Sequence, residues 1–204
     1  HRTVAQDQPA HGYGLPSLRN SLVMALVCLG LGSNLNDRKN EIQQAGSWLK
    51  HSILGEMRKS YINESEPIGV ADQPFLNSVA AGTTALAPDE LLQRCKEYES
   101  RRQRDFSRPR WSNRPIDIDI IGYNNEIIRT DSLKIPHPEY ANRLFVLYPL
   151  QEIFPDWSDP ISKKAIEKLN KQDREKWADA YKTRLKGLRS IIWEATVKNL
   201  QKQK

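Results

Sequence analysis

The sequence predicts an α+β domain in which two helices cover one face of an antiparallel sheet. Three observations carry this expectation. Short β-capable runs alternate with two segments of helical period, turn residues separate them, and their order is β-α-β-β-α-β followed by a late hairpin. That order is the ferredoxin-like pattern. A length of 204 residues, 38% of them hydrophobic, suits such a domain and excludes a disordered or collagen-like chain.

The first strand is expected at residues 24–31, an apolar run that reads MALVCLGL. A Gly-Ser-Asn turn follows it, and an Asn-Asp pair then precedes a helical pattern that continues to Leu49. Residues 53–61 predict a second strand, and residues 64–74 form a loop punctuated by Pro and Gly. This half of the pattern is therefore strand, helix, strand.

The second half of the pattern begins with a third strand at residues 75–85. A helix is predicted over residues 88–102, because Pro and two acids stand at its start and two arginines at its end. An Arg-rich loop, residues 104–114, leads into a strand at residues 116–123. The Asn-Asn pair that follows predicts a tight turn and a hairpin with residues 126–129.

The charge is distributed unevenly and divides the chain into three parts. Residues 161–204 have a net charge of +8, which leaves −2 for residues 1–160 out of a total of +6. We expect a domain at residues 23–160 and a basic helical extension at residues 161–204, whose apolar residues recur every three or four positions. Residues 1–22 are polar and without period, as in a leader, tag or linker.

The rest of the sequence bears on membrane insertion, on the state of the cysteines and on possible partners. No run approaches the 18 or so apolar residues that a membrane span needs. Cys28 and Cys95 lie in a strand-like and a helix-like run, so both are expected to be buried, reduced thiols of a cytoplasmic protein. The basic extension could pack on the domain itself or on a second subunit, or attach to a membrane or a nucleic acid; the oligomeric state is open.

The candidate chemistry begins with Asp117 and Asp119. Residues two apart on a strand point to the same face, so the two carboxylates are directed at one spot. Such a pair suits Mg²⁺ that also carries substrate phosphates, although two exposed acids on a solvent-facing strand are the simpler alternative. Arginine grips phosphate oxygens in pairs, and six arginines precede the strand, namely Arg101, Arg102, Arg104, Arg108, Arg110 and Arg114.

A second cluster follows the predicted hairpin. His137 stands between two prolines, and Arg143 follows six residues later, so both could reach one anion; alone this signal is weak. The sequence has no P-loop, dinucleotide-binding, nucleophile-elbow or zincin motif.

Over about residues 24–157 the sequence resembles the 6-hydroxymethyl-7,8-dihydropterin pyrophosphokinase family, whose fold is ferredoxin-like. The resemblance rests on five blocks in order: Leu31-Gly32-Ser33-Asn34-Leu35 with Asp37-Arg38; Glu66-Pro67-Ile68-Gly69 with Asp72-Gln73-Pro74-Phe75-Leu76-Asn77; Arg110-Trp111-Ser112-Asn113-Arg114; Asp117-Ile118-Asp119; and Pro136-His137-Pro138 with Asn142-Arg143-Leu144-Phe145. Asn36 departs from the usual Gly, but Asn tolerates the same left-handed backbone.

The resemblance implies transfer of pyrophosphate from ATP to the hydroxymethyl group of a reduced pterin, with release of AMP. It implies two Mg²⁺ ions held by Asp117 and Asp119, with Arg104 and Arg114 as further catalytic residues. It places the ATP-binding role on Glu99, Arg110, Arg114, Leu133, His137 and Arg143. Phe106 departs from the family pattern, since some members have Arg at this position.

For the pterin, the resemblance implies that aromatic faces and a few fixed hydrogen bonds form the site. The matched positions are Ser65, Pro67, Ile68, Phe75, Asn77, Trp111 and Phe145. The partners expected are ATP and the reduced pterin, without nucleic acid or membrane, and fusion to or contact with another folate enzyme is possible. The alternatives are a ferredoxin-like RNA-binding module with a basic tail, against which the net charge of −2 argues, or an inactive homologue.

Overall fold

The computed structural model describes residues 24–67, 69–109 and 111–164. The expected leader at residues 1–22 and the expected basic extension from residue 165 onward lie outside the described residues, as do the candidate site residues Ile68 and Arg110.

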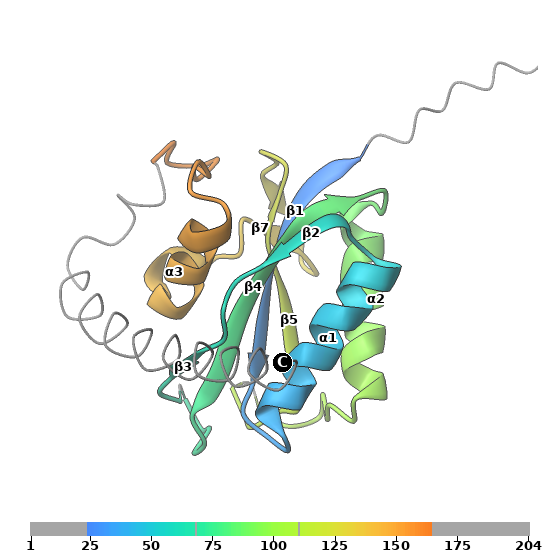
Figure 1. Ribbon diagram of the computed structural model, residues 1–204, viewed down its shortest axis with the longest axis vertical. Helices are drawn as coiled ribbons and strands as arrows, with labels where there is room; N and C mark the ends of the chain where they lie inside the picture. Colours follow the sequence, from blue (N-terminus) through green and yellow to red (C-terminus); the bar gives the residue numbers. More distant parts are fainter. Residues whose placement is uncertain (1–23, 68, 110, 165–204) are drawn as a thin grey trace, which may run out of the picture.

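A five-stranded antiparallel sheet forms the centre of the molecule (Figure 1). Its order is β2-β4-β1-β5, with the short strand β3 also paired to β4. The strands are β1 (Ala25–Ser33), β2 (Gly55–Lys59), β3 (Asn63–Ser65), β4 (Phe75–Thr84) and β5 (Asp117–Tyr123). With β3 set aside, this is the ferredoxin-like order that the alternation of strands and helices predicts.

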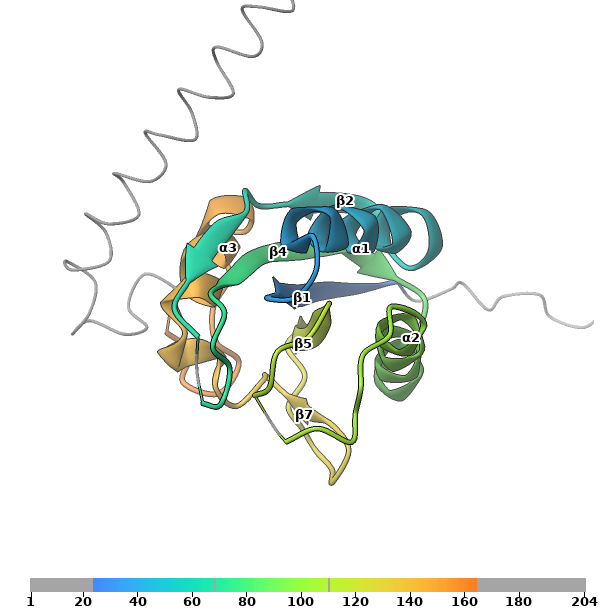
Figure 2. The ribbon, with the colours of Figure 1, turned by 90° about the horizontal axis from the view of Figure 1, so that it is seen from below.

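Helices cover both faces of this sheet. The helices α1 (Arg38–Ser52) and α2 (Pro88–Arg101) lie on one face, and α3 (Leu144–Ile153), preceded by the 3-10 turn η1 (Tyr140–Asn142), lies on the other (Figures 1 and 2). Asp37 caps α1 by accepting a hydrogen bond from the Asn40 backbone N–H at 3.1 Å. Among the described residues, no helix has the length and apolarity that crossing a membrane would require.

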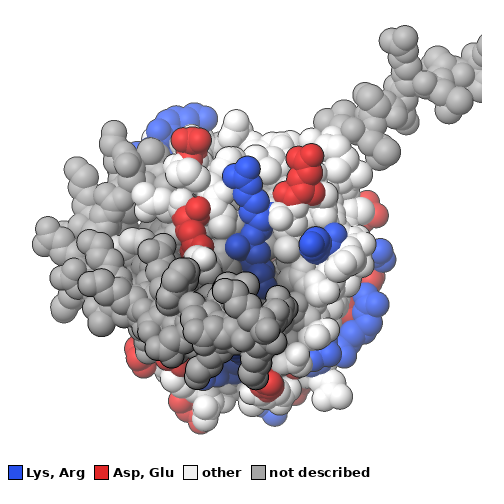
Figure 3. Space-filling model, viewed as in Figure 1, with Lys and Arg blue, Asp and Glu red and all other residues white. Residues whose placement is uncertain are grey.

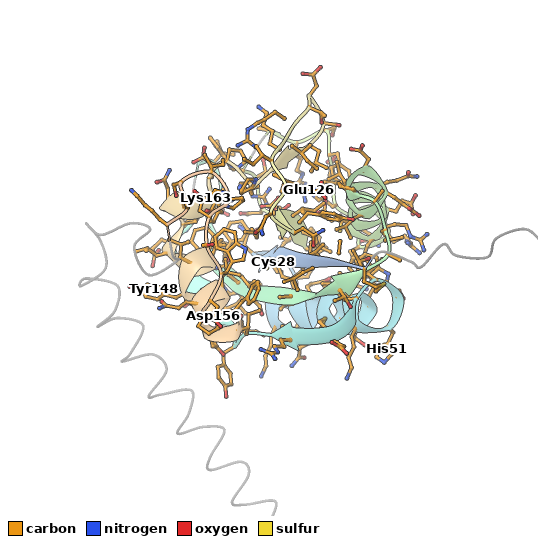
Figure 4. All side chains as sticks on the ribbon, turned by 90° about the horizontal axis from the view of Figure 1, so that it is seen from above. Cys28, His51, Glu126, Tyr148, Asp156 and Lys163 are labelled. Carbon is orange, nitrogen blue, oxygen red and sulfur yellow. The ribbon has the colours of Figure 1, made fainter. Side chains whose placement is uncertain are left out.

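Alternation along β1 divides the apolar core between the two faces. Val27, Leu29 and Leu31 belong to the cluster beneath α1 and α2, whereas Cys28 belongs to the cluster beneath α3. Cys28 accordingly lies in the interior and His51 at the periphery (Figure 4). Both cysteines are buried and unpaired, which confirms the expectation of free, buried thiols.

The register of β5 against β1 contains an irregularity that matters for the site. Cys28 pairs with Gly122, but Leu29 pairs with Ile120, so Ile121 is an extra residue on β5. A one-residue shift exchanges the two faces of a strand. On the N-terminal side of the bulge, Ile118 and Ile120 enter the α1/α2 core, and the two aspartates face the opposite side of the sheet. Beyond the bulge, Tyr123 enters the same core three residues after Ile120.

Three parts of the sequence-based expectation need correction. The predicted hairpin of residues 116–123 with residues 126–129 is wrong. The Asn124 side chain and backbone instead bind Leu26, and β6 (Ile128–Arg129) pairs with β7 (Lys134–Ile135) in a separate two-stranded sheet. The strand β3 occupies the start of the predicted loop. The helix α3 was not expected, because its apolar run contains Pro149 and has no clear period.

Candidate active site

A cleft opens on the α3 face of the sheet. Its floor is the central strand β1, where Gly32 pairs with Asn77 on β4 and with Asp117 on β5. Directly opposite residues on antiparallel strands share a face, so a side chain at Gly32 would stand between these two. A Cβ built there would lie 3.6 Å from the Phe75 ring and 3.6 Å from Asn77 Oδ1, with no overlap. Because Gly32 has no side chain, nothing projects from the floor of the cleft at this position.

Asp117 and Asp119 line one end of the cleft, as their spacing on the strand predicts. Arg104 donates a short hydrogen bond to Asp117, and Arg114 Nη1 lies 3.4 Å from Asp117 Oδ2. On the other side, Arg143 Nη1 lies 3.6 Å and His137 Nε2 3.7 Å from Asp119 Oδ2. Four basic side chains therefore surround the two carboxylates.

The two carboxyl groups differ in their ionisation. Burial opposes the charge of Asp117, but the guanidinium groups of Arg104 and Arg114 outweigh it and lower the pKa of Asp117 below its usual value. Burial, and then the negative charge of Asp117, raise the pKa of Asp119 to about 6. The Asp119 carboxylate is therefore the one whose charge is less completely balanced by the protein.

The donor set at this end of the cleft fits Mg²⁺. Carboxylate oxygens are its preferred protein ligands, and Mg²⁺ is usually held by one or two carboxylates together with substrate phosphates. Within the described ranges no group of three or more His, Cys, Asp or Glu side chains could hold a metal by itself. The pair Asp117 and Asp119 can thus supply part of a coordination sphere that a phosphorylated substrate completes.

Glu99 lies behind this cluster, and its side chain is completely buried. Its Oε1 accepts a hydrogen bond from the Ile118 backbone N–H at 2.7 Å, and its Oε2 accepts one from Arg104. Lys96 Nζ lies 3.0 Å from Oε1. Burial raises the pKa of Glu99, while Lys96 and Arg104 counteract that rise. In this structure Glu99 holds β5 and Arg104 in position and does not line the cleft.

Aromatic and amide groups line the other end of the cleft. Phe75 is buried, and the Arg114 guanidinium carbon lies 5.4 Å from its ring centroid. Asn77 is buried and donates to Ser65 Oγ at 3.0 Å. Phe145 lies under Arg143, whose guanidinium carbon is 5.9 Å from the ring centroid. The residues expected to bind a flat heterocycle and those expected to bind phosphates therefore lie in one cleft.

The structure brings together some of the candidate residues and leaves others apart. Those that line the described cleft are Ser65, Phe75, Asn77, Trp111, Arg114, Asp117, Asp119, Arg143 and Phe145. Trp111 remains 39% exposed to solvent. Arg104 and His137 contact the carboxylates but are not part of the cleft lining. Pro67 is not part of the lining, and Leu133 is buried in the α1/α2 core.

Sequence reasoning assigned no role to three polar residues beside the cleft, Asn34, Asp72 and Asn113. Asn34 is 1% exposed, and its Nδ2 donates to Asn113 Oδ1 at 2.7 Å and to the Gln73 carbonyl at 3.1 Å. Asn113 Nδ2 donates in turn to Asp72 Oδ1. All three stand in blocks of the family resemblance, but their chain separations of 79 and 41 residues gave no sign of contact.

Comparisons with known proteins relate this chain to one family. The family model for 7,8-dihydro-6-hydroxymethylpterin-pyrophosphokinase (HPPK) matches residues 28–155. The 2-amino-4-hydroxy-6-hydroxymethyldihydropteridine pyrophosphokinase of Aquifex aeolicus is 41% identical over 152 residues, which are 74% of this chain and 93% of that protein. The corresponding protein of Bacillus subtilis is 40% identical over 132 residues, 63% of this chain and 77% of that protein.

Other relatives are much longer than the matched region. The folate synthesis bifunctional protein of Chlamydia trachomatis is 38% identical over 137 residues, and the match covers 63% of this chain but 30% of that protein. The crystal structure of wild-type Plasmodium falciparum HPPK-DHPS with pteroate has a TM-score of 0.59 and 15% identity, covering 76% of this chain and 44% of that chain. At that identity the likeness shows the fold alone.

Proposed function

Because the chain belongs to the 7,8-dihydro-6-hydroxymethylpterin pyrophosphokinase family, we propose that its cleft transfers pyrophosphate from ATP to 6-hydroxymethyl-7,8-dihydropterin. The products are the pterin diphosphate and AMP, and the reaction belongs to folate synthesis. The observation that carries the proposal is the single cleft in which two carboxylates ringed by cations face an aromatic pocket.

Asp117 and Asp119 are proposed to hold Mg²⁺, two ions in number, with ATP supplying further oxygen ligands. Mg²⁺ bound there would neutralise charge on the phosphates as the hydroxymethyl oxygen bonds to the β phosphorus and the bond from that phosphorus to the oxygen of departing AMP breaks. The chain's own part is to present both carboxylates on one rigid strand. Plain alternation supports this, because Ile118 and Ile120 pack into the α1/α2 core from the other face of the same strand.

The triphosphate is proposed to be bound by four basic side chains, namely Arg114, Arg143, His137 and Arg104. Arg114 carries a further sign of this role, since its buried Nε has no hydrogen-bond partner among the described residues. A buried donor without a partner costs about 1–3 kcal/mol, and a phosphate oxygen would remove that cost. Guanidinium groups that are fixed before the substrate arrives need no reorganisation in the transition state.

Phe75 and Phe145 are proposed to sandwich the pterin ring, and Asn77 to bind its polar edge. Asn77 Nδ2 already donates to Ser65 Oγ and to the Phe75 carbonyl, so the amide presents its Oδ1 to the ligand as a fixed acceptor. Trp111 would close the open side, and the roles of Pro67, Ile68 and Arg110 remain part of the proposal. Nothing in the described site supplies a dedicated general base. Positioning and charge neutralisation carry most phosphoryl-transfer catalysis, so none is required.

A domain spanning residues 23–160 and a cytoplasmic location complete the proposal. The two unpaired thiols are consistent with a reducing compartment. The longer relatives add a second folate-pathway activity to this unit, and a fusion of that kind is compatible with the present chain. The RNA-binding alternative gains no support, since positive and negative side chains are interspersed on the described part of the face in Figure 3.

The test is AMP release from ATP in the presence of Mg²⁺ and 6-hydroxymethyl-7,8-dihydropterin. Asp117→Ala should lower turnover by about 100-fold or more, as expected for loss of a group that stabilises the transition state. Asp105→Asn is the matched control and should leave turnover unchanged, because the Asp105 side chain is 51% exposed in the loop. Release of ADP, or turnover that does not depend on the pterin, would contradict the proposal.

A further inference from the structure

Three buried side chains connect the last described residues to the turn at residues 137–143. They are Tyr140, Trp157 and Asp159, which we call the anchor, and they are 4%, 6% and 6% exposed. None of the three lines the cleft, and the proposed function uses none of them. The anchor lies instead beneath the turn that delivers two basic side chains to the carboxylates.

This turn carries a proposed phosphate-binding side chain at each end. The Tyr140 N–H donates to the His137 carbonyl at 3.2 Å, and the Arg143 N–H donates to the Tyr140 carbonyl at 3.1 Å. His137 Nε2 lies 3.7 Å and Arg143 Nη1 3.6 Å from Asp119 Oδ2. Because Tyr140 is bonded to both ends of the turn, its position determines where the two basic side chains stand.

Trp157 packs against both this turn and the strand that carries Asp119. Its ring meets the Tyr140 ring edge-on, with centroids 5.3 Å apart and planes at 90°, which is a favoured geometry for an aromatic pair. The same indole contacts β5, where a Cβ built on Gly122 would lie 3.7 Å from Trp157 Cζ2. Gly122 follows Asp119 by three residues. The indole therefore fixes the spacing between the turn and the strand.

Asp159 organises the last described turn and adjoins Tyr140. Its carboxylate accepts hydrogen bonds from the N–H groups of Ile161 at 3.3 Å and Ser162 at 2.8 Å. Tyr140 Oη is buried and makes no hydrogen bond of ordinary geometry within the described part of the chain. Burial and the nearby Asp159 carboxylate nevertheless raise the pKa of the Tyr140 phenol. The Tyr140 side chain is thus enclosed at its ring and at its hydroxyl.

From these contacts we infer that the anchor positions His137 and Arg143 to receive the phosphates of the substrate. Tyr140 and Trp157 are positioning residues, because they lie outside the cleft and act through the turn. The inference rests on the proposed function for the identity of the phosphate ligand. Basic groups that are fixed in advance need no reorganisation when the phosphates arrive, whereas a loosened turn has to be ordered by the ligand at a cost in affinity.

The test measures the dissociation constant of α,β-methylene-ATP with Mg²⁺ for the full chain and its variants. Trp157→Leu removes the ring contact with Tyr140 but keeps an apolar side chain. We expect the dissociation constant to rise about three- to tenfold, the size of one lost aromatic contact. The constant for 6-hydroxymethylpterin, measured with the nucleotide analogue saturating, should stay within about twofold, because the buried residues of α3 hold Phe145 in place.

Two further variants separate positioning from a general loss of stability. Trp48→Leu is the matched control, because Trp48 stacks on Tyr98 with centroids 4.3 Å apart and joins α1 to α2 away from the cleft. It should lower the free energy of unfolding and leave both dissociation constants unchanged. Trp157→Phe retains an aromatic ring and should restore most of the affinity for the nucleotide.

A double-mutant cycle tests whether the effect passes through the turn. In a chain that carries His137→Ala and Arg143→Ala, the anchor has no basic side chain left to position. Trp157→Leu should then change the dissociation constant of the nucleotide by less than about twofold. A merely structural effect would not depend on these two side chains and would persist in that chain.

Three results would overturn the inference: unchanged nucleotide affinity in folded Trp157→Leu, an equal loss in Trp48→Leu, or a full effect in the chain without His137 and Arg143 side chains. If circular dichroism shows that Trp157→Leu does not fold, Tyr140→Leu removes the same contact from the other side and carries the same expectations. Wild-type AMP release tests the proposed function separately. A wild type that makes AMP, with normal nucleotide binding in Trp157→Leu, would retain its function and refute the anchor.

Discussion

At the scale of single residues, the site depends on charges that are buried and balanced. Glu99 illustrates this, because a carboxylate with no exposed surface touches Lys96, Arg104 and the Ile118 backbone. Removing one partner of a buried ion pair leaves the others uncompensated, which costs more than the pair contributes. Arg104 and β5, both next to the carboxylates that are proposed to bind Mg²⁺, depend on this one group.

Glu99→Gln should therefore destabilise the fold by about 3–5 kcal/mol. The amide retains an acceptor for Ile118 but no charge for the two cations. Glu97→Gln is the matched control, because Glu97 on the same helix is 43% exposed and pairs with Arg94 at 3.9 Å; it should cost no more than about 1 kcal/mol. Urea unfolding followed by circular dichroism measures both, and equal losses would refute the structural role of Glu99.

The two thiols should be unreactive in the native chain. Burial raises the pKa of Cys28 and of Cys95 to about 12, so almost no thiolate exists at pH 8. Iodoacetamide should label neither cysteine in buffer and both in urea, as mass spectrometry would detect. Rapid labelling of the native protein would mean that the sheet opens locally around β1 or α2.

At the scale of the elements, helix termini differ in how well the sequence caps them. Asp37 caps α1 through its side chain, whereas Ala87 at the start of α2 has the extended backbone of a cap but offers no side-chain acceptor. The first turn of α2 already carries Asp89 and Glu90, which favour its dipole.

Ala87→Ser should therefore stabilise the fold by about 0.5–2 kcal/mol, and Asp37→Ala should destabilise it by a similar amount. Opposite shifts in the midpoint of urea unfolding are expected. Ala87→Val, which offers no acceptor at the same exposed position, is the control for a change of side-chain size.

A different outcome is expected at Gly32, because a Cβ added there would make ordinary van der Waals contacts and no clash. Gly32→Ala should leave the free energy of unfolding unchanged or slightly higher, since alanine loses less backbone entropy on folding, by about 0.5–1 kcal/mol. The added methyl group raises the floor between Asn77 and Asp117, so the KM for the pterin should increase several-fold. A variant that loses stability but keeps its KM would contradict this account of the cleft floor.

Most of the helices and strands could be predicted from the sequence, but some of their contacts could not. Period and turn residues predicted β1, α1, β2, β4, α2 and β5, and the spacing of Asp117 and Asp119 predicted their shared face. The partner of β6 was missed, because the Asn124 turn is held by Leu26, which lies 98 residues away. The hydrogen bonds among Asn34, Asp72 and Asn113 were missed for the same reason. The bulge at Ile121 was missed as well, although Gly122, a residue type often found at bulges, directly follows it. Local pattern cannot report contacts that tertiary packing creates.

At the scale of the whole molecule, the domain is a scaffold with two unlike faces. One face is closed by α1 and α2 over an apolar core, and the other is shared between α3 and the cleft. Ligands that bind only the folded cleft therefore stabilise the entire fold by mass action.

Mg²⁺ with α,β-methylene-ATP should raise the melting temperature, corresponding to about 2.7 kcal/mol at a ligand concentration 100 times the dissociation constant. EDTA should remove most of that increase, because the phosphates would then face Asp117 and Asp119 without a cation between them. Differential scanning fluorimetry measures the shift, with Asp117→Ala as the variant whose response to Mg²⁺ should be lost. An increase that EDTA leaves intact would contradict the metal-binding role of the aspartates.

The pairing of Gly32 with both Asn77 and Asp117 has a consequence for the length of the reaction site. Neighbouring strands lie about 4.8 Å apart, so the backbones that carry the amide proposed to bind the pterin ring and the carboxylate proposed to face the phosphates are separated by roughly 10 Å. Hydrogen bonds between main chains set that value, and no side chain contributes to it. The hydrogen-bonded sheet therefore fixes the distance between these two positions. Surface and helix sequences can diverge widely without altering it, whereas one residue inserted into β1 beyond the bulge would offset the acceptor from the phosphates and end the chemistry.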